Sequence, residues 1–323
     1  MRYALTGATG FVGGALAAQL REAGHDVAAL VRTPDRAAHL SGLGVELVPG
    51  DLDDTAALDR LCSGADGLFH VAGWYKLGQR DRTAGRRVNV DGTRQVLAAA
   101  QRAGVPRVVY TSTLAVNSDT RGEVRDESYR FTGRHLSVYD ATKAEAHEVA
   151  EEYAAAGLPL VIVMPGLVYG PGDTSQTGAL IEQVARGKRP MAPGGGGVCW
   201  AHVDDVARGH VLAMESGRLG ASYMLAGPRT SLADGLHRVA AVAGTRGPVV
   251  MPAGAIALTS RLTALLERVV PLPPDYASET LRAALATYYG TPALAERELG
   301  WSARPLDEGL AETVAALRAT HPA

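Results

Sequence analysis

The sequence has little of several features that would each point to a particular class of protein. It contains two cysteines, Cys62 and Cys199, which form no metal-ligand spacing and would make a thin disulfide framework for 323 residues. The expected setting is therefore a reduced cytoplasm, and no metal is expected. The formal net charge is only −2 and no basic stripe occurs, which argues against binding of nucleic acid.

Long hydrophobic segments are also missing. No run of about 18 or more apolar residues occurs, so no integral membrane segment is expected. The most apolar late run, residues 253–272, is interrupted by Arg261, Glu267 and Arg268, and we interpret it as an amphipathic helix, with peripheral membrane contact as the alternative. The chain opens MRYALTGATG, so a strand is expected almost at once, with no room for a signal peptide.

What the sequence does contain is an alternation of strand-length apolar runs and longer helical patterns. Strands are expected at 3–6, 26–31, 45–49, 67–71, 107–111 and 158–164, and helices at 11–23, 54–62, 86–103 and 137–156. The strands are apolar on both faces, as a parallel sheet covered by helices requires. The pattern predicts an α/β fold, a Rossmann-type doubly wound parallel sheet.

The pattern changes after Pro165. A Gly/Pro-rich loop (165–175), a helix (176–187) and a glycine run (193–197) indicate a region that faces the substrate, followed by a helix (203–214) and a strand (222–227) that rejoins the main sheet. The rest of the chain, from Ser231, is expected to be mainly helical. We therefore predict a dinucleotide-binding domain over 1–170, with 203–227 returning to it, and a smaller, mainly helical substrate-binding region over 171–202 and 228–323.

A glycine pattern lies between the first strand and the first helix. The stretch TGATGFVG, residues 6–13, has GxxGxxG spacing. In this context Gly7 permits a tight turn, Gly10 lets the backbone approach a pyrophosphate, and Gly13 lets the helix pack on the strand. Free N–H groups and the helix dipole favour phosphate there. The alternative is a purely structural strand–helix turn.

The end of the second strand indicates which dinucleotide binds. Sites that prefer NAD carry an acidic residue there, but this chain has Arg32, with Arg36 nearby. A guanidinium pairs well with a 2′-phosphate, so we predict NADP (NADPH) and consider NAD the less favoured cofactor. The alternative is a solvated arginine. Asp51 follows the third strand, where it could bind the adenine amine, and His70 is expected to be packed at a strand end.

Taken together, the motifs resemble the extended short-chain dehydrogenase/reductase superfamily, which includes the NAD-dependent epimerase/dehydratase family. They occur in the family's order: TGxxGxxG, GDL, HVAG, NVDGT, YTST, the YxxxK of YDATK (139–143) and PGLVYGPGD, with HVDDVARGH and AERELGW downstream. The resemblance covers essentially the whole chain. It is nearest to the dihydroflavonol-reductase-like branch and its hopanoid-associated sugar epimerase relatives.

The resemblance implies a role for each residue at a matching position. Tyr139 would be the catalytic acid/base, and Lys143 would bind the nicotinamide ribose and lower the tyrosine pKa. Thr113 would orient the substrate, although the neighbouring Ser112 leaves the register open, and Asn89 would help to structure the catalytic site. The implied cofactor-binding residues are Gly7, Thr9, Gly10, Phe11, Val12, Gly13, Arg32, Asp51, Leu52, Val71, Ala72, Gly73, Thr111, Ser112, Tyr139, Lys143, Pro165, Gly166 and Val168.

The implied chemistry is hydride transfer with proton transfer by a phenol. A free tyrosine titrates near pH 10, so acid/base work near neutrality requires a shift of about three units, roughly 4 kcal/mol. The Lys143 ammonium and an oxidised nicotinamide would supply it by stabilising phenolate. The hydroxyl groups of Thr113 and Tyr139 would hold the carbonyl oxygen of the substrate.

Departures from the family pattern bear on the substrate. Sugar-nucleotide dehydratases carry Thr-Asp-Glu after the fifth strand, but this chain has Leu114 and Ala115 there. The stretch MPGLVYGPG is closer to the reductases than to the epimerases. The residues expected to shape a partly apolar substrate pocket are Trp74, Tyr75, Thr113, Leu167, Tyr169 and Trp200, with the loop 171–178. Core packing is the alternative for each aromatic among them.

The sequence therefore predicts an NADP(H)-dependent oxidoreductase that acts on a small or medium organic molecule. Two alternatives stay open: an NAD-dependent sugar-nucleotide epimerase, and a non-catalytic NADP-sensing protein of the same fold. The resemblance also allows a homodimer formed through the helices at 86–103 and 137–156.

Overall fold

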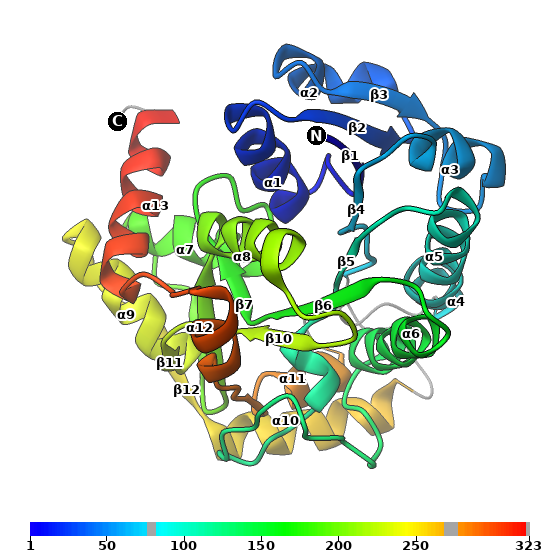
Figure 1. Ribbon diagram of the computed structural model, residues 1–323. Helices are drawn as coiled ribbons and strands as arrows, with labels where there is room; N and C mark the ends of the chain where they lie inside the picture. Colours follow the sequence, from blue (N-terminus) through cyan, green and yellow to red (C-terminus); the bar gives the residue numbers. More distant parts are fainter. Residues whose placement is uncertain (76–81, 268–276, 321–323) are drawn as a thin grey trace.

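A seven-stranded parallel sheet forms the centre of the molecule. The computed structural model describes residues 1–75, 82–267 and 277–320. The strand order is β10-β6-β5-β4-β1-β2-β3, and every pair is parallel (Figure 1). The strands are β1 (Arg2–Thr6), β2 (Asp26–Val31), β3 (Glu46–Pro49), β4 (Gly67–His70), β5 (Val108–Thr111), β6 (Leu160–Pro165) and β10 (Ser222–Leu225). This is a Rossmann-type doubly wound sheet, as the alternating pattern predicted.

Helices cover both faces of this sheet (Figure 1). On one face α1 (Phe11–Glu22) and α8 (Val203–Ser216) pack over a core that includes Leu16, Val161 and Tyr223. On the other, α3 (Thr55–Cys62), α5 (Gly92–Ala103) and α6 (Val138–Ala155) pack over a second core that includes Leu97 and Ile162. Because both faces are covered, all six residues of β6 are buried, which explains why the strands lack alternating polarity.

Three features of the chain path differ from or complete the sequence prediction. The helix expected at 86–103 is continuous but not uniform, since α4 (Arg82–Arg86) runs into a π-helical turn, η2 (Arg87–Asp91), before α5. The 3-10 turn η1 (Pro34–Ala37) and α2 (Ala38–Gly42) fill the connection between β2 and β3, where no element was predicted. The strand expected at 222–227 does join the main sheet, as β10 beside β6. The division into two domains stays a prediction.

The region beyond β6 is mainly helical, as expected, but it also contains a small sheet. A small sheet centres on β9 (Gly197–His202), which pairs with β7 (Leu167–Tyr169), β11 (Arg229–Thr230) and β13 (Thr287–Tyr288). A two-stranded ribbon joins β8 (Met191–Gly194) to β12 (Val249–Pro252). The glycine run at 193–197, where no strand was predicted, thus lies between and within strands, because partners distant in sequence supply the pairing and local composition does not reveal it.

Helices pack around this small sheet. They are α7 (Gln176–Ala185), α9 (Leu232–Ala243), α10 (Ala253–Leu266), α11 (Ser278–Ala283), α12 (Ala293–Leu299) and α13 (Leu306–Thr320). A third core, which includes Ile181, Leu236 and Leu310, lies between β9 and the helices α7, α9 and α13. The apolar run predicted at 253–272 forms α10, and its last residues, 268–272, lie outside the described residues. Within the described ranges, no helix combines the length and apolarity needed to cross a bilayer.

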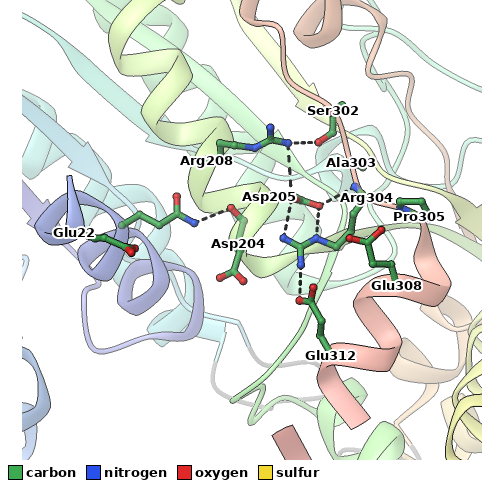
Figure 2. Close-up of a pocket in the computed structure, with 11 residues that line it drawn as sticks. Glu22, Asp204, Asp205, Arg208, Ser302, Ala303, Arg304, Pro305, Glu308 and Glu312 are labelled. Carbon is green, nitrogen blue, oxygen red and sulfur yellow. Dashed lines mark hydrogen bonds and ion pairs between the residues drawn. The ribbon is translucent and has the colours of Figure 1, made fainter. Parts of the chain in front are cut away.

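An ion-pair cluster binds the C-terminal segment to the start of α8 (Figure 2). The buried carboxylate of Asp205, at the start of α8, accepts hydrogen bonds from the Arg304 backbone N–H and guanidinium at 2.9–3.1 Å, and Arg304 also pairs with Glu312 on α13. His202, Asp204 and Glu312 offer ligand atoms within 4.8 Å of one another. The Arg304 guanidinium already supplies a positive charge to this cluster, so we interpret the cluster as a structural tie.

Candidate active site

The glycine loop lies at the point where the strand order of the sheet reverses, between β1 and β4. Gly7 has φ +81°, and a Cβ there would lie 2.6 Å from the backbone nitrogen of Ala72. A Cβ at Gly13 would overlap the Gly7 carbonyl oxygen. Both positions thus require glycine, because backbone occupies the space that a side chain needs. Gly10 begins α1 without a side-chain cap, so the first N–H groups of the helix are available to an anion. This cradle fits a dinucleotide pyrophosphate.

The predicted adenosine contacts lie at the ends of the next two strands. Arg32 directly follows β2 and Arg36 lies in η1, and both side chains are exposed. Within residues 1–75, 82–267 and 277–320, no other side chain or backbone group pairs with either guanidinium. Asp51 follows β3, and its carboxylate accepts the N–H of Leu52 at 2.8 Å. Two free guanidiniums beside the loop can bind a 2′-phosphate. The preference for NADP over NAD stays a prediction.

Other predicted cofactor contacts gather at the same edge of the sheet. Because all strands of the main sheet are parallel, the residues that follow β1, β4, β5 and β6 meet at one edge. These are Thr9, Phe11 and Val12 after β1, Val71, Ala72 and Gly73 after β4, Thr111 and Ser112 at the end of β5, Pro165 and Gly166 at the end of β6, and Val168 in the following strand β7. The structure thus brings the candidates together, and their individual contacts stay predictions.

Lys143 is buried on α6, four residues after Tyr139. Its Nζ donates to the carbonyl oxygen of Thr111 at 2.7 Å and to the hydroxyl of Tyr110 at 3.1 Å, and it lies 4.8 Å from the Tyr110 ring centroid. Burial lowers the pKa of Lys143 from 10.5 to about 7. The amine therefore titrates near neutrality, and its position is set by β5.

Tyr139 sits on the same face of α6, between two other side chains. Its hydroxyl hydrogen-bonds with the side chain of Thr113, and the ring of Tyr75 meets its ring edge-on at 5.0 Å. Burial is the largest influence on its pKa and raises it above the ordinary value of 10. In the protein alone, then, the pKa shift runs opposite to the lowering expected from Lys143, because desolvation of phenolate dominates and the Lys143 amine points to β5.

The structure resolves which hydroxyl faces the tyrosine. The Ser112 hydroxyl lies 2.8 Å from Nδ1 of His147, and its N–H donates to the Val163 carbonyl, so both groups are engaged away from Tyr139. Thr113 instead lies beside Tyr139 and caps a 3-10 turn by accepting the Ala115 N–H at 3.2 Å. Thr113 is therefore the residue that can orient a substrate, and Ser112 can offer a cofactor only its carbonyl group.

Asn89 is a positioning residue rather than one that meets reacting atoms. It is buried in the π-helical turn η2, where its amide oxygen accepts the Trp74 N–H at 2.7 Å. Its amide nitrogen donates to the Trp74 carbonyl at 3.1 Å and to the Thr142 hydroxyl at 3.0 Å. Asn89 thus ties the segment after β4 to α6 between Tyr139 and Lys143, contacts that suit the expected structuring role, which stays a prediction. Such π-turns occur often at functional sites.

Two of the predicted substrate residues belong to the core. Tyr169 and Trp200 are 1% and 0% exposed, and their rings meet at 5.4 Å within the third core. A Cβ at Gly235 on α9 would overlap the Trp200 indole, which shows how closely the two pack. The prediction that they line the substrate pocket is wrong, because the β7–β9 pairing turns both side chains toward α7, α9 and α13. Trp74, Tyr75 and Leu167 keep some exposure and stay candidates.

Sequence reasoning missed a buried polar chain beneath the catalytic pair. Tyr110, which accepts from Lys143, also hydrogen-bonds with Thr93, and its ring stacks on His70 at 5.5 Å. His70 lies 3.0 Å from the Thr93 hydroxyl and 2.7 Å from the Thr6 hydroxyl. Burial lowers the pKa of His70 to about 3, so it is neutral. The one sequence signal was the position of Tyr110 directly before the TST motif.

A second missed pair borders Tyr139. Tyr288, on β13, donates its hydroxyl to the buried carboxylate of Asp140 at 3.2 Å, and burial raises the pKa of Asp140 to about 6. Nothing in the sequence could have linked these residues, because they are 148 positions apart and meet only through the small sheet around β9.

Comparisons with known proteins place the whole chain in one family. The model of the NAD dependent epimerase/dehydratase family matches residues 3–226. A putative dihydroflavonol 4-reductase of Synechocystis is 36% identical over 96% of this chain and 92% of its own length. A 4-hydroxy-2-methyl-3-oxo-4-farnesyl-3,4-dihydroquinoline-1-oxide ketoreductase of Stigmatella aurantiaca is 36% identical over 70% of this chain and 68% of its own.

One further relative and one solved structure extend the picture. A 2-alkyl-3-oxoalkanoate reductase of Stenotrophomonas maltophilia is 30% identical over 84% of both chains. The crystal structure of gox2253 superimposes with a TM-score of 0.86 at 32% identity, over 99% of this chain and 98% of that one. The similarity thus includes the small sheet and the C-terminal helices as well as the dinucleotide-binding half.

Proposed function

The chain belongs to the NAD dependent epimerase/dehydratase family, and we propose that it is an NADP(H)-dependent oxidoreductase that reduces a carbonyl group, or oxidises the corresponding alcohol. The observation that carries this proposal is the grouping of three side chains at the carboxyl ends of the strands of the main sheet. The Tyr139 phenol hydrogen-bonds with Thr113, and the Lys143 amine lies one helical turn further along α6. An acid/base, an orienting hydroxyl and a titratable amine in this arrangement suit proton transfer to a carbonyl oxygen.

The protein's own groups handle the oxygen atom of the substrate. The bound dinucleotide supplies the hydride for reduction. Thr113 and Tyr139 donate hydrogen bonds to the carbonyl oxygen, and Tyr139 transfers its proton as that oxygen becomes an alkoxide. In the reverse direction the phenolate accepts the alcohol proton. Burial alone disfavours phenolate, so the positive charge needed to stabilise it comes from a protonated Lys143 and from cofactor binding.

NADP is the proposed cofactor because of the charge at the end of β2. Arg32 and Arg36 are exposed there, and β2 ends without the carboxylate that would accept a ribose 2′-hydroxyl. An unpaired guanidinium binds a 2′-phosphate through charge-assisted hydrogen bonds. The variant Arg32→Ala tests this preference for NADP.

The proposed substrate is a ketone that carries an apolar chain. Two reductases similar to this chain are named for ketones with a farnesyl or an alkyl substituent. Tyr75, whose ring meets that of Tyr139, and its neighbour Trp74 are both partly exposed. These two aromatic residues would offer apolar surface to such a chain. An NAD-dependent sugar-nucleotide epimerase is the second candidate, because the matching family model is named for NAD dependent epimerases and dehydratases, and a similar solved structure at 28% identity is titled a nucleoside-diphosphate-sugar epimerase.

A substrate screen separates these candidates. Purified protein would be mixed with NADPH and a series of 3-oxo esters of increasing alkyl length, and NADPH consumption followed by absorbance. We expect turnover that improves with chain length and is much slower with NADH. Conversion of a sugar nucleotide by protein that retains NAD through purification, with no ketone reduced, would replace the proposal with the epimerase.

A further inference from the structure

Exposed apolar side chains gather on one unit formed by β8, β12 and α10. Twelve large hydrophobic residues are exposed in the described part of the chain, and seven of them lie here. The seven, which we call the leucine platform, are Met191, Val249, Val250, Leu258, Leu262, Leu265 and Leu266. The four leucines are 49–59% exposed, and their spacing puts them along one side of α10. Such a gathered apolar surface marks an interaction site.

The platform is a continuous part of the fold. Val249 pairs with Met191 across the β8–β12 ribbon, and β12 runs directly into α10. The opposite side of α10 is anchored, since Ile256 and Ser260 are buried and the Ser260 hydroxyl donates to the Ser278 carbonyl at 3.1 Å. The leucines therefore face outward because the other side of the helix already packs on the protein.

The charge around the platform is positive, unlike that of the whole chain. Residues 187–197 and 246–267 contain one acidic residue, Glu267, against four basic ones, whereas the chain as a whole carries −2. The four, Lys188, Arg189, Arg246 and Arg261, are all exposed. Apolar side chains flanked by exposed cations match a bilayer with anionic headgroups. A second copy of the same surface would bring like charges together, which disfavours self-association.

The platform also connects to the catalytic helix. Glu267, at the end of α10, accepts the Ser278 N–H and hydroxyl at 2.7 Å, and Glu279 on α11 accepts the Val138 N–H at 3.0 Å. Val138 directly precedes Tyr139. A cavity of about 960 Å³ lies between the start of α6, α10 and α11, with Arg134 and Arg282 among its lining residues. A lipid surface held against α10 would thus lie beside the first turn of the helix that carries Tyr139.

We propose that the leucine platform docks on the surface of an anionic lipid bilayer, so that a substrate with a hydrocarbon chain reaches the catalytic site from the lipid. The route for the substrate rests on the proposed function, but the docking does not. Docking requires that the four leucines enter the interface and that the surrounding cations meet lipid phosphates.

Vesicle flotation tests the docking directly with the full chain. Vesicles of phosphatidylcholine alone would be compared with vesicles that also contain phosphatidylglycerol, at low and high salt. The platform variant would be Leu262→Ser/Leu265→Ser, and the matched control Leu43→Ser/Leu219→Ser, which changes two exposed leucines outside the platform. We expect binding to anionic vesicles that salt weakens, at least tenfold weaker partitioning of the platform variant, and no change in the control. Arg261→Ala should cost about fivefold.

Three results would overturn the docking proposal: no binding to either vesicle, equal binding by the platform variant, or a wild-type dimer that the platform variant dissociates while vesicles stay unbound. Turnover of a water-soluble, short-chain 3-oxo ester gives an independent readout of the proposed function. Binding without turnover of any ketone would keep the docking and reject the reductase. Turnover of a ketone without binding to vesicles would keep the reductase and reject the docking.

Discussion

At the scale of single residues, the physical environment decides what each catalytic candidate can do. Tyr139 and Lys143 are the residue types that the proposed chemistry needs, but burial raises the pKa of the phenol and lowers that of the amine to about 7. Both shifts favour the neutral forms. Phenolate formation therefore requires added positive charge, which a protonated Lys143 and a bound cofactor would supply.

Tyr139→Phe tests the proton-transfer role. The substitution removes one hydroxyl and keeps the ring that meets Tyr75 edge-on, so we expect normal folding, nearly unchanged cofactor affinity and loss of most turnover. Single-turnover measurements on a verified substrate give the rate of hydride transfer. Tyr153→Phe is the control, because Tyr153 lies near the C-terminal end of the same helix, where its hydroxyl donates to the Arg94 carbonyl at 3.4 Å. A near-parental rate in Tyr139→Phe would contradict the assigned mechanism.

Arg32→Ala tests the cofactor preference. If the guanidinium meets the 2′-phosphate, its loss removes charge-assisted hydrogen bonds worth about 1.5–3 kcal/mol, or roughly ten- to hundredfold in affinity for NADPH. Affinity for NADH should hardly change. Calorimetric titration of both cofactors measures this, and Arg36→Ala shows whether the neighbouring arginine shares the contact. Equal losses for the two cofactors, or tighter binding of NADH by the wild type, would refute the preference.

At the scale of elements, the first turn of α6 carries a capping arrangement that includes Asp140, a carboxyl group that titrates close to neutral pH. The Ser137 hydroxyl accepts the Asp140 N–H at 2.9 Å and donates to the Asp140 carboxylate at 2.7 Å. A carboxylate at a helix N-terminus is normally favoured by the dipole, which lowers its pKa. Here burial outweighs the dipole and raises the pKa of Asp140 from 3.8 to about 6.

The raised pKa predicts a pH-dependent stability. Because the folded protein holds the proton more tightly than the unfolded chain, Asp140 destabilises the fold increasingly as the pH rises from about 4 to above 6. Asp140→Asn removes that dependence, so its unfolding free energy relative to the wild type should rise by about 2–3 kcal/mol between pH 4 and pH 7. Chemical denaturation at several pH values measures this. A difference that stays constant with pH would contradict it.

Two helical glycines provide a matched test of packing. A Cβ at Gly235 on α9 would overlap the Trp200 ring, whereas a Cβ at Gly254 on α10 would meet nothing within 4 Å. We expect Gly235→Ala to lower the unfolding free energy by about 1–3 kcal/mol, because the third core has no room for it. Gly254→Ala should be neutral or stabilise α10 by up to about 1 kcal/mol. Denaturant titration compares them, and equal effects would disprove the packing argument.

At the scale of the whole molecule, the C-terminal segment must hold the small sheet and its helices against the main sheet. Arg304 does this by bonding to Asp205 at the start of α8 and to Glu312 on α13 (Figure 2). The Asp205 side chain is only 7% exposed, so its carboxylate depends on this partner. The residues around the tie include neither Tyr139 nor Lys143, so we interpret it as part of the assembly of the fold and not of the chemistry.

Arg304→Met tests the tie. Removing the Arg304 guanidinium leaves the buried Asp205 carboxylate with only the Arg208 guanidinium, 3.8 Å away, which should cost up to about 3–5 kcal/mol of stability. Arg238→Met, which breaks an exposed pair with Asp307, should cost at most about 1 kcal/mol. Thermal and chemical unfolding measure both, while cofactor affinity of the folded fraction should stay unchanged. Similar small losses in the two variants would show that Arg304 is not a structural tie.

The strands and helices of the main sheet were predictable because their signals are local. Continuous apolar runs such as β6 and a glycine loop between β1 and α1 follow from burial on both faces and from backbone space, so their neighbours in sequence suffice to identify them. Tyr139 and Lys143 were recognisable for the same reason, since one helix spaces them. The short pairings of β8 and β9 were not, because glycine-rich strands carry no periodicity and their partners are far away in the chain.

What the sequence determined by itself was the order along the chain of the main-sheet strands and their covering helices, the position of the glycine loop and the residue types at the catalytic edge. The tertiary structure alone decided which hydroxyl faces Tyr139, that Trp200 packs in the core, that Tyr288 meets Asp140, and that α10 turns its leucines outward. Each of these depends on contacts between segments distant in the chain. The hydrophobic effect favours burial of apolar residues in general. Only the assembled fold decides which residues each of them packs against, and which of them stay exposed.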